Sequence, residues 1–148
     1  MSKPLRSRTI VLVEDNDDDI ELTQHALSKA NLYSDLVVAR SGEEAVELMH
    51  GPTGVASGSM ALPALMLLDL KLPGIGGLDV LKQMREIDAT RRMPVVILTT
   101  SDDETDVMEG YDLGANSYIH KPMDSADFNR VVDKLGLYWL TINIPAAS

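Results

Sequence analysis

The sequence predicts an α/β domain in which a parallel sheet of five strands is covered by helices on both faces. Three short apolar runs contain no alternating polar residues, as expected for strands that are buried on both sides. The segments between the runs carry apolar residues at helical spacing instead. Strands and helices therefore alternate along the chain, and this order favours right-handed crossovers and an open parallel sheet.

The strongest strand signals are the apolar runs at residues 9–13, 65–68 and 95–98, which read TIVLV, LMLL and VVIL. Their leucines and β-branched residues suit a sheet that is covered on both faces. Two weaker runs, LVVA at 36–39 and SYIH at 117–120, bring the predicted number of strands to five.

Helices are predicted between and after these strands. Ser41 opens a capping box with Glu44 and starts the second helix, which runs through Met49, whereas Ser125 can cap the last helix. The apolar faces of the first, third, fourth and fifth helices consist, in that order, of Ile20, Thr23, Leu27 and Ala30; Val80, Leu81, Met84 and Ile87; Val107, Met108 and Tyr111; and Phe128, Val131, Val132 and Leu135.

The chain divides into three expected parts. Residues 1–8 form a flexible N-terminus, residues 9–137 form the domain, and residues 138–148 form an apolar C-terminal extension. Within the domain, residues 51–60 read GPTGVASGSM. These small residues and turn formers predict a long surface loop before the third strand.

Length and composition narrow the functional classes. With 148 residues, 45% of them hydrophobic, the chain fits one domain with a single core. A net charge of -10 argues against binding to nucleic acid or to an anionic membrane. The chain has no cysteine, which excludes disulfides and thiol chemistry. No apolar stretch approaches the roughly 18 residues of a membrane span, and residues 1–8 lack the apolar core of a secretory signal, so a cytoplasmic protein is expected.

Polar residues directly follow the predicted strands. Glu14 and Asp15 come after the first strand, Asp69 after the third, Thr99 ends the fourth and Lys121 follows the fifth. In an open parallel sheet, ligands bind outside the carboxyl ends of the strands. We therefore expect these carboxylates, the hydroxyl and the ammonium group to converge on one edge of the sheet.

This set of groups suits Mg²⁺ and phosphoryl chemistry. Crowded carboxylates repel one another, and a hard divalent cation that prefers oxygen ligands compensates for them. We expect Asp15 and Asp69 to be direct ligands and Glu14 to act through a water molecule. Asp69 then serves as the nucleophile, because carboxylates can form acyl phosphates. Lys121 would neutralise the transferred group, and the Thr99 hydroxyl would donate a hydrogen bond to it.

The sequence resembles the receiver domain of two-component response regulators over about residues 9–137. The motifs that carry the resemblance are VED at 13–15, LLDLKLPG at 67–74, LTTS at 98–101 and GANSYIHKP at 114–122. Each motif is weak alone, but together, in this order and at strand ends, they are highly specific. The resemblance implies a flavodoxin-like sheet with strand order 2-1-3-4-5.

The resemblance also implies a role for each site residue. Asp69 would accept a phosphoryl group from a phosphohistidine on a sensor histidine kinase, and the backbone carbonyl of Lys71 would be a third protein ligand to Mg²⁺. The chain would be a phosphoacceptor with at most slow self-dephosphorylation, tuned by Lys71 and Ser101, and not an enzyme. Thr99 and Tyr118 match the switch pair of the family. The peptide bond before Pro122 would be cis, a geometry largely confined to proline.

A narrower resemblance concerns the loop at 51–60, Pro63 and the end of the chain. These features look like the small response regulators that partner bacterial and cyanobacterial phytochromes. The kinase partner would then be a light-sensing histidine kinase. Because residues 138–148 are too few for a DNA-binding or catalytic output domain, we expect output through protein contacts.

The C-terminal extension predicts a homodimer. Its apolar residues follow a helix that already supplies a core face, so we expect them to be excess apolar surface. Leu140, Ile142 and Ile144 alternate with polar residues in a strand-like pattern before Pro145. The alternative is that the extension folds back onto its own domain. The candidate dimer residues are Tyr138, Trp139, Leu140, Ile142 and Ile144.

Other interpretations stay open at this point. An aspartyl-phosphate phosphatase of the haloacid dehalogenase type would need an acidic residue two positions after the nucleophile, where this chain has Lys71. A nucleotide or flavin binder would need a glycine-rich phosphate loop after a strand, and none is present. A phosphorylation-independent interaction module would not need the acidic set. Asp17, Asp18 and Asp19 are predicted to be a solvated helix start.

Overall fold

In the computed structural model, residues 8–29, 35–121 and 124–146 are described, and they form one five-stranded parallel sheet. The strand order is β2-β1-β3-β4-β5, which confirms the predicted fold. All four pairs of neighbouring strands are parallel, so the carboxyl ends of the strands meet at one edge. The strands are β1 (Thr9–Val13), β2 (Asp35–Ala39), β3 (Leu65–Leu68), β4 (Val95–Thr99) and β5 (Ser117–His120).

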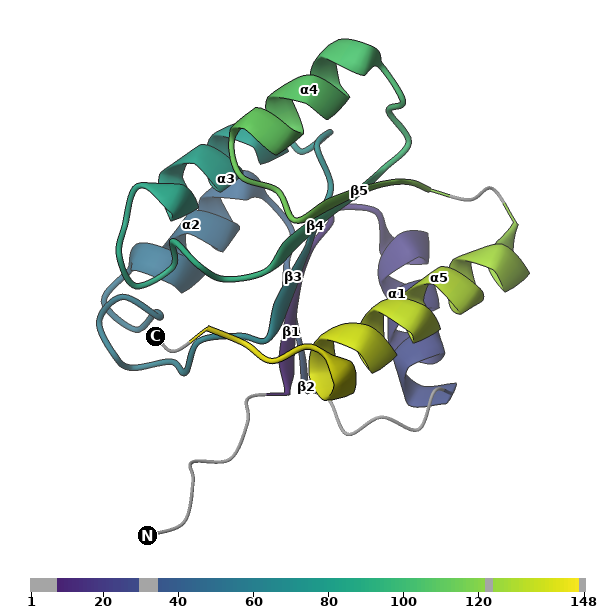
Figure 1. Cartoon of the computed structure of the whole chain (residues 1–148), viewed down its shortest axis with the longest axis horizontal. Helices are drawn as coiled ribbons and strands as arrows, with labels where there is room; N and C mark the ends of the chain where they lie inside the picture. The colour runs from purple at the N-terminus through teal and green to yellow at the C-terminus, as the bar shows by residue number, and fades with distance from the viewer. Residues whose placement is uncertain (1–7, 30–34, 122–123, 147–148) are drawn as a thin grey trace, which may run out of the picture.

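Helices cover both faces of the sheet. As Figure 1 shows, α1 and α5 lie on one face and α2, α3 and α4 on the other. Ser41 caps α2 by accepting a hydrogen bond from the Glu44 N–H group, as the capping box predicts, whereas Asp124, not Ser125, caps α5. The helices are α1 (Asp17–Lys29), α2 (Gly42–His50), α3 (Gly77–Arg85), α4 (Glu104–Asp112) and α5 (Ser125–Leu137).

Apolar side chains on both faces of the strands account for their uninterrupted apolar runs. Successive side chains of a strand point to opposite faces, so each central strand needs apolar residues at every position. Val11, Met66 and Ile97 belong to the core beneath α2 and α3. Leu12 and Leu67 belong to the second core, which α1 and α5 cover.

Helix α4 forms as predicted, but its apolar residues do not all face the core. Met108 and Tyr111 are exposed, and the buried residue of the helix is Gly110. A Cβ atom at Gly110 would lie 2.8 Å from Ile97 Cδ1 and 3.3 Å from the Tyr118 ring. Glycine therefore lets the backbone of α4 approach the sheet closely, and the large side chains turn outward.

The loop at residues 51–60 is more closely packed than a surface loop. Val55 lies in the core beside α2, and its N–H group donates to the Leu48 carbonyl at 3.0 Å. The Ala56 N–H group donates to the Met49 carbonyl at 2.8 Å. These bonds fasten the loop to the last turn of α2, so only part of it is a surface segment.

The predicted strand-like conformation of the C-terminal extension is wrong. Residues Tyr138–Ile142 continue α5 as a π-helical turn, closed by a hydrogen bond of 2.7 Å from the Asn143 N–H group to the Tyr138 carbonyl. This turn buries Leu140 completely in the core formed with α1 and α5. Leu140 is therefore not excess surface, whereas Ile142 and Ile144 remain exposed.

No helix among the described residues is long and apolar enough to cross a membrane.

Candidate acidic phosphoacceptor site

Three carboxylates meet at the carboxyl edge of the sheet. Glu14 and Asp15 follow β1, and Asp69 follows β3. The Asp69 N–H group donates to the Val13 carbonyl at 3.1 Å, so the sheet ladder continues past the strand ends and holds the three residues together. One oxygen atom from each carboxylate lies within 4.8 Å of the others. The expected convergence of these residues is thus present.

Lys121 joins these carboxylates from the end of β5. Its Nζ atom lies 2.6 Å from Glu14 Oε2 and 3.2 Å from Asp69 Oδ2. The Lys121 side chain is only 7% exposed, which strengthens these contacts because water screens them little. The ammonium group is therefore positioned against the candidate nucleophile Asp69.

Asp19 is a further member of the site that the sequence interpretation missed. Its Oδ2 atom lies 2.8 Å from Lys121 Nζ, and its side chain is 28% exposed. By contrast, Asp17 is exposed and pairs with Arg40 at the surface. The prediction of a solvated helix start is therefore wrong for Asp19, which turns from the first turn of α1 into the site.

The burial of these groups shifts their pKa values. Burial raises the pKa of Glu14 to about 7, although the hydrogen bond from Lys121 opposes the shift. Burial also disfavours the charged form of Lys121, but its hydrogen bonds to Asp19 and Glu14 and the charge of Asp69 overcome this effect and raise its pKa. Lys121 therefore stays a cation, and its charge holds the carboxylates together.

The three carboxylates fit a hard divalent cation. Asp15 is exposed and can reach a metal from the solvent side, whereas Glu14 is buried and already accepts from Lys121 and from the Asn16 N–H group at 3.1 Å. This difference agrees with a direct contact from Asp15 and an indirect one from Glu14. The Lys71 N–H group donates to Asp69 Oδ1 at 3.2 Å, which keeps Lys71 beside the site. The role of the Lys71 carbonyl as a ligand stays a prediction.

Gly77 brings the start of α3 against the candidate nucleophile. A Cβ atom at this position would lie 2.2 Å from the Asp69 carbonyl oxygen. The Gly77 N–H group donates to the Leu70 carbonyl at 3.1 Å. Any side chain here would displace the segment that carries Asp69 and Lys71, so the close approach requires glycine.

Thr99, Ser101 and Tyr118 form a connected group next to the site. Thr99 is fully buried, and its Oγ1 atom accepts a long hydrogen bond of 3.4 Å from the Ser101 N–H group. The Tyr118 hydroxyl donates to the Ser101 carbonyl at 2.8 Å. The Ser101 hydroxyl in turn donates to Asp106 Oδ2 at 2.7 Å, which ties the group to α4. Ser101 is thus the physical link between the two residues of the predicted switch pair.

His120 and Pro122 are the remaining residues to consider at this edge of the sheet. His120 Nε2 lies 2.9 Å from the Thr100 carbonyl oxygen and connects β5 to the segment after β4. Pro122 lies outside the described residues, so the predicted cis peptide bond before it stays a prediction.

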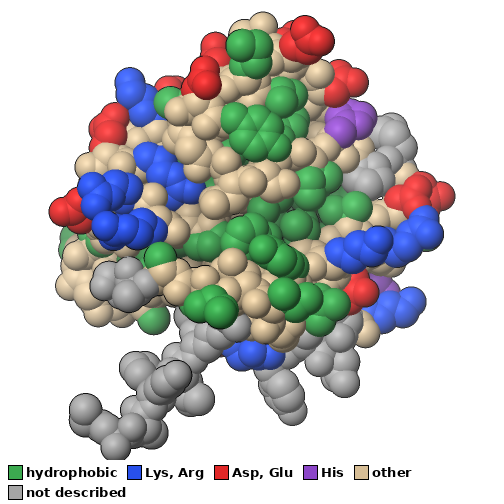
Figure 2. Space-filling view, viewed as in Figure 1, with side chains coloured by type: hydrophobic (Ala, Val, Ile, Leu, Met, Phe, Trp, Pro, Cys, Tyr) green, Lys and Arg blue, Asp and Glu red, His purple; other side chains and the backbone are tan. Residues whose placement is uncertain are grey.

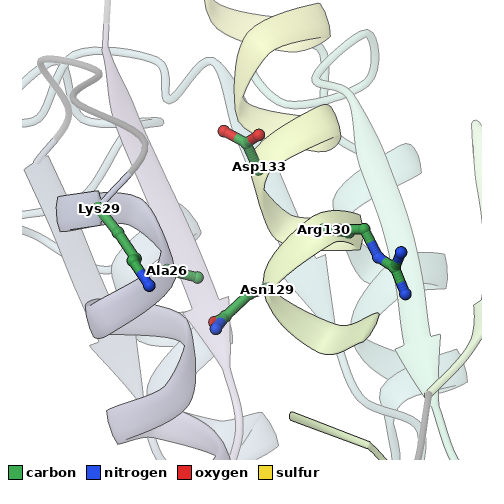
Figure 3. A pocket seen from close by; sticks show the side chains of 5 residues that line it. All are labelled: Ala26, Lys29, Asn129, Arg130 and Asp133. Atoms are coloured by element: carbon green, nitrogen blue, oxygen red, sulfur yellow. The ribbon is translucent and has the colours of Figure 1, made fainter. Parts of the chain in front are cut away.

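The hollow between α1 and α5 has a different character. As Figure 3 shows, Asn129 points from α5 toward Ala26 on α1, while Arg130 points away from it. Among the described residues, the buried Asn129 Oδ1 atom has no hydrogen-bond partner. Among the described residues that line this hollow, Asp133 is the only one with a carboxylate. The convergent charges therefore identify the sheet edge, and not this hollow, as the candidate functional site.

Comparisons with known proteins agree with this geometry. A model of the response regulator receiver domain matches residues 10–133. The chain is 36% identical over 141 residues to the response regulator Rcp1 of Synechocystis sp., and the match covers 95% of each chain.

Solved structures of response regulators also match nearly the whole of this chain. The phosphorylated cyanobacterial phytochrome response regulator RcpA matches with a TM-score of 0.87 and 33% identity, over 96% of this chain and 100% of that chain. The Mn²⁺-bound form of Rcp1 matches with a TM-score of 0.84 and 32% identity, over 95% and 99% of the two chains.

Proposed function

This chain belongs to the response regulator receiver domain family, and on that premise we propose that Asp69 accepts a phosphoryl group from a sensor histidine kinase. One observation carries the proposal: the Asp69 carboxylate lies 3.2 Å from the buried Lys121 ammonium group and within the cluster that includes Glu14 and Asp15. A cation and carboxylate oxygens that could hold a metal ion thus lie around the candidate nucleophile.

In the proposed reaction, an Asp69 oxygen forms a bond to phosphorus while the bond from phosphorus to the kinase imidazole breaks. If the imidazole would otherwise leave as an anion, it takes up a proton from solvent. Lys121 offsets negative charge on the transferred group, and Thr99 is placed on the same edge to donate a hydrogen bond. Because Lys71 occupies the position two residues after Asp69, the site lacks the general acid of a haloacid dehalogenase-type phosphatase.

Asp15 and Asp69 would hold the proposed Mg²⁺ directly, with Glu14 behind a water molecule and the Lys71 carbonyl as a further ligand. When bound, Mg²⁺ would supply positive charge that stabilises the phosphoryl oxygens during transfer. The relative Rcp1 has a Mn²⁺-bound form, which supports the proposal that this chain binds a divalent cation.

Replacing Asp15 by Asn should raise the Mg²⁺ concentration needed for phosphorylation by about tenfold or more, because the change removes an anionic ligand oxygen. The measurement is the intact mass of the chain after incubation with acetyl phosphate over a series of Mg²⁺ concentrations. Asp18→Asn is the matched control, since Asp18 is exposed in the same stretch and outside the carboxylate cluster. Identical Mg²⁺ dependence in the parent and Asp15→Asn would show that Asp15 is not a ligand.

The bonds through Ser101 support a switch in which phosphorylation is transmitted from Thr99 to Tyr118. A Thr99 hydroxyl that turns toward the phosphoryl group would no longer accept from the Ser101 N–H group. The Ser101 carbonyl, which accepts from the Tyr118 hydroxyl, would then be free to move with its loop. These bonds would then form a two-state element that new contacts at the phosphate bias.

Thr99→Ala should still accept phosphate but show much smaller NMR chemical-shift changes around Tyr118 on phosphorylation. The reason is that the variant lacks the hydroxyl that connects the phosphate to Ser101. Thr100→Ala is the control, because that neighbouring side chain is exposed. If Thr99→Ala and the parent show equal changes around Tyr118, the proposed coupling is wrong.

The relatives suggest the kind of kinase. RcpA is described as a phytochrome response regulator, and it matches nearly the whole of this chain. We therefore propose a light-sensing histidine kinase as the partner that phosphorylates Asp69.

We further propose a homodimer through the surface of α4, β5, α5 and the C-terminal extension. All large apolar side chains that are markedly exposed among the described residues lie on α4, α5 or the extension. Figure 2 shows apolar side chains gathered between α4 and α5. A hollow lined by Ile119, Val131 and Trp139, among others, lies on this surface. These exposed side chains are Met108, Tyr111, Leu137, Tyr138, Ile142 and Ile144.

Ile142→Asp should convert the dimer to a monomer, because it places a charge in the proposed apolar interface at a residue that is 59% exposed. Sedimentation at high micromolar concentration, with and without phosphorylation, measures the change. Ala56→Asp adds the same charge in the exposed part of the 51–60 loop and should leave the dimer intact. A parent chain that sediments as a monomer in both states would contradict the proposed dimer.

A further inference from the structure

The ammonium group of Lys121 has no free hydrogen for a new ligand. An ammonium group donates three hydrogen bonds, and Lys121 has three carboxylate partners. Its Nζ atom lies 2.6 Å from Glu14, 2.8 Å from Asp19 and 3.2 Å from Asp69. A phosphoryl group that approaches Asp69 can therefore bind this ammonium before transfer only if one of the present partners gives way.

The three partners differ in how easily they can be released. Glu14 is 3% exposed on its side chain and also accepts from the Asn16 N–H group, so releasing it would leave a buried carboxylate without its cation. Asp69 is the proposed acceptor, and its carboxylate keeps its negative charge and its contact with Lys121 until the bond to phosphorus forms. Asp19 is 28% exposed, so water can solvate its carboxylate after it leaves Lys121. Asp19 is thus the partner that is least costly to displace.

The backbone of Asp19 is fixed even though its side chain reaches the solvent. The Asp19 N–H group donates to Asn16 Oδ1 at 3.0 Å, and the Asp19 carbonyl accepts from the Thr23 hydroxyl at 2.8 Å. Asp19 lies outside the cluster of carboxylates that could hold a metal ion, which consists of Glu14, Asp15 and Asp69. Its partly exposed carboxylate therefore lies beside Lys121, where its charge acts on the ammonium group and on any anion that approaches.

Resting on the proposed phosphoacceptor function of Asp69, we propose that Asp19 is a specificity-determining residue that competes with the incoming phosphoryl group for Lys121. In the unphosphorylated protein, Asp19 occupies a hydrogen-bonding position on Lys121 that a phosphoryl oxygen would take during transfer. Its negative charge also opposes the entry of free anionic phosphodonors. Asp19 therefore slows phosphorylation by small anionic donors relative to transfer from a kinase that docks through its own protein surface.

The test compares Asp19→Asn with the parent in phosphorylation by acetyl phosphate at saturating Mg²⁺, followed by intact mass. Removing one charge near the site at partial exposure should raise the rate about fivefold. The same variant should bind beryllofluoride, an anionic mimic of the phosphoryl group, more tightly by a similar factor in an NMR titration. A residue that merely held Lys121 in place would produce the opposite change in both measurements.

Two control variants separate charge competition from other causes. Asp18→Asn removes the same charge from the neighbouring exposed residue and should change the rate by less than about twofold, because salt and water screen it. Asp19→Glu restores the charge and should return the rate toward that of the parent. Increasing ionic strength should also reduce the difference between Asp19→Asn and the parent.

The outcomes also separate this inference from the proposed function. If neither the parent nor Asp19→Asn accepts phosphate in Mg²⁺, from acetyl phosphate or from a sensor histidine kinase, the proposed function fails. If the parent accepts phosphate and Asp19→Asn reacts no faster than Asp18→Asn, only the role of Asp19 is overturned. A lower rate or weaker beryllofluoride binding in Asp19→Asn would likewise overturn it.

Discussion

Asp69→Asn should abolish phosphorylation of this chain, whereas the parent should gain the mass of one phosphoryl group from acetyl phosphate and Mg²⁺. The change removes the nucleophilic oxygen while keeping the size of the side chain. Asp69 is the carboxylate that both contacts Lys121 and is held by a backbone N–H group from Lys71. The amide can still accept from that N–H group, so we expect the fold to be retained.

The control for this prediction is Asp15→Asn at saturating Mg²⁺. Asp15 belongs to the same carboxylate cluster, but the ion pairs of Lys121 with described residues are those with Glu14, Asp19 and Asp69. The Asp15 variant should therefore still accept phosphate when the metal concentration is high enough. Full phosphorylation of Asp69→Asn would show that another residue is the acceptor.

Leu140→Ala should lower the free energy of unfolding by about 2 to 5 kcal/mol, the usual cost of removing a large side chain from a core. Leu140 is completely buried with Phe128 and Val132 of α5, although it belongs to the C-terminal extension. Denaturant unfolding at low micromolar concentration, where association contributes little, measures the loss.

Ile142→Ala is the matched control for Leu140→Ala. Ile142 lies in the same π-helical turn but is 59% exposed, so its replacement should change the free energy of unfolding by less than about 0.5 kcal/mol. Equal stabilities of the two variants would contradict the packing of the extension.

The same argument predicts that truncation after Gly136 destabilises the domain, which makes truncation an unsuitable test of the dimer.

The strand-end residues could be predicted because their positions follow from the sheet. Uninterrupted apolar runs indicated the buried strands, and the carboxyl ends of parallel strands necessarily meet at one edge. The convergence of Glu14, Asp69 and Lys121 could therefore be predicted without knowing the conformations of their side chains.

Asp19 could not be identified in the same way. It stands among three successive aspartates at a helix start, and each of them satisfies the helix dipole equally well. Only the rotation of α1 against the sheet decides which aspartate reaches Lys121, and the two residues are 102 positions apart in the chain. Sequence pattern alone does not determine that rotation.

The extension was misinterpreted although a signal for its structure was present. Leu140, Ile142 and Ile144 alternate as in a strand, but Leu140 also follows Val132 and Gly136 at steps of four residues. That spacing is helical and continues the buried face of α5, on which all three residues are buried. Both the strand-like alternation and the helical spacing fit these residues. The packing of Leu140 against the domain favours the helical conformation.

The most direct test of the central claim is phosphotransfer from an autophosphorylated sensor histidine kinase, with the modified residue located by peptide mapping after chemical trapping of the acyl phosphate. Light-sensing histidine kinases are the first candidates to examine. We predict loss of phosphate from the kinase, gain of one phosphoryl group by this chain in the presence of Mg²⁺, and trapping at Asp69. Phosphate trapped at a different residue, or efficient transfer to Asp69→Asn, would contradict the account.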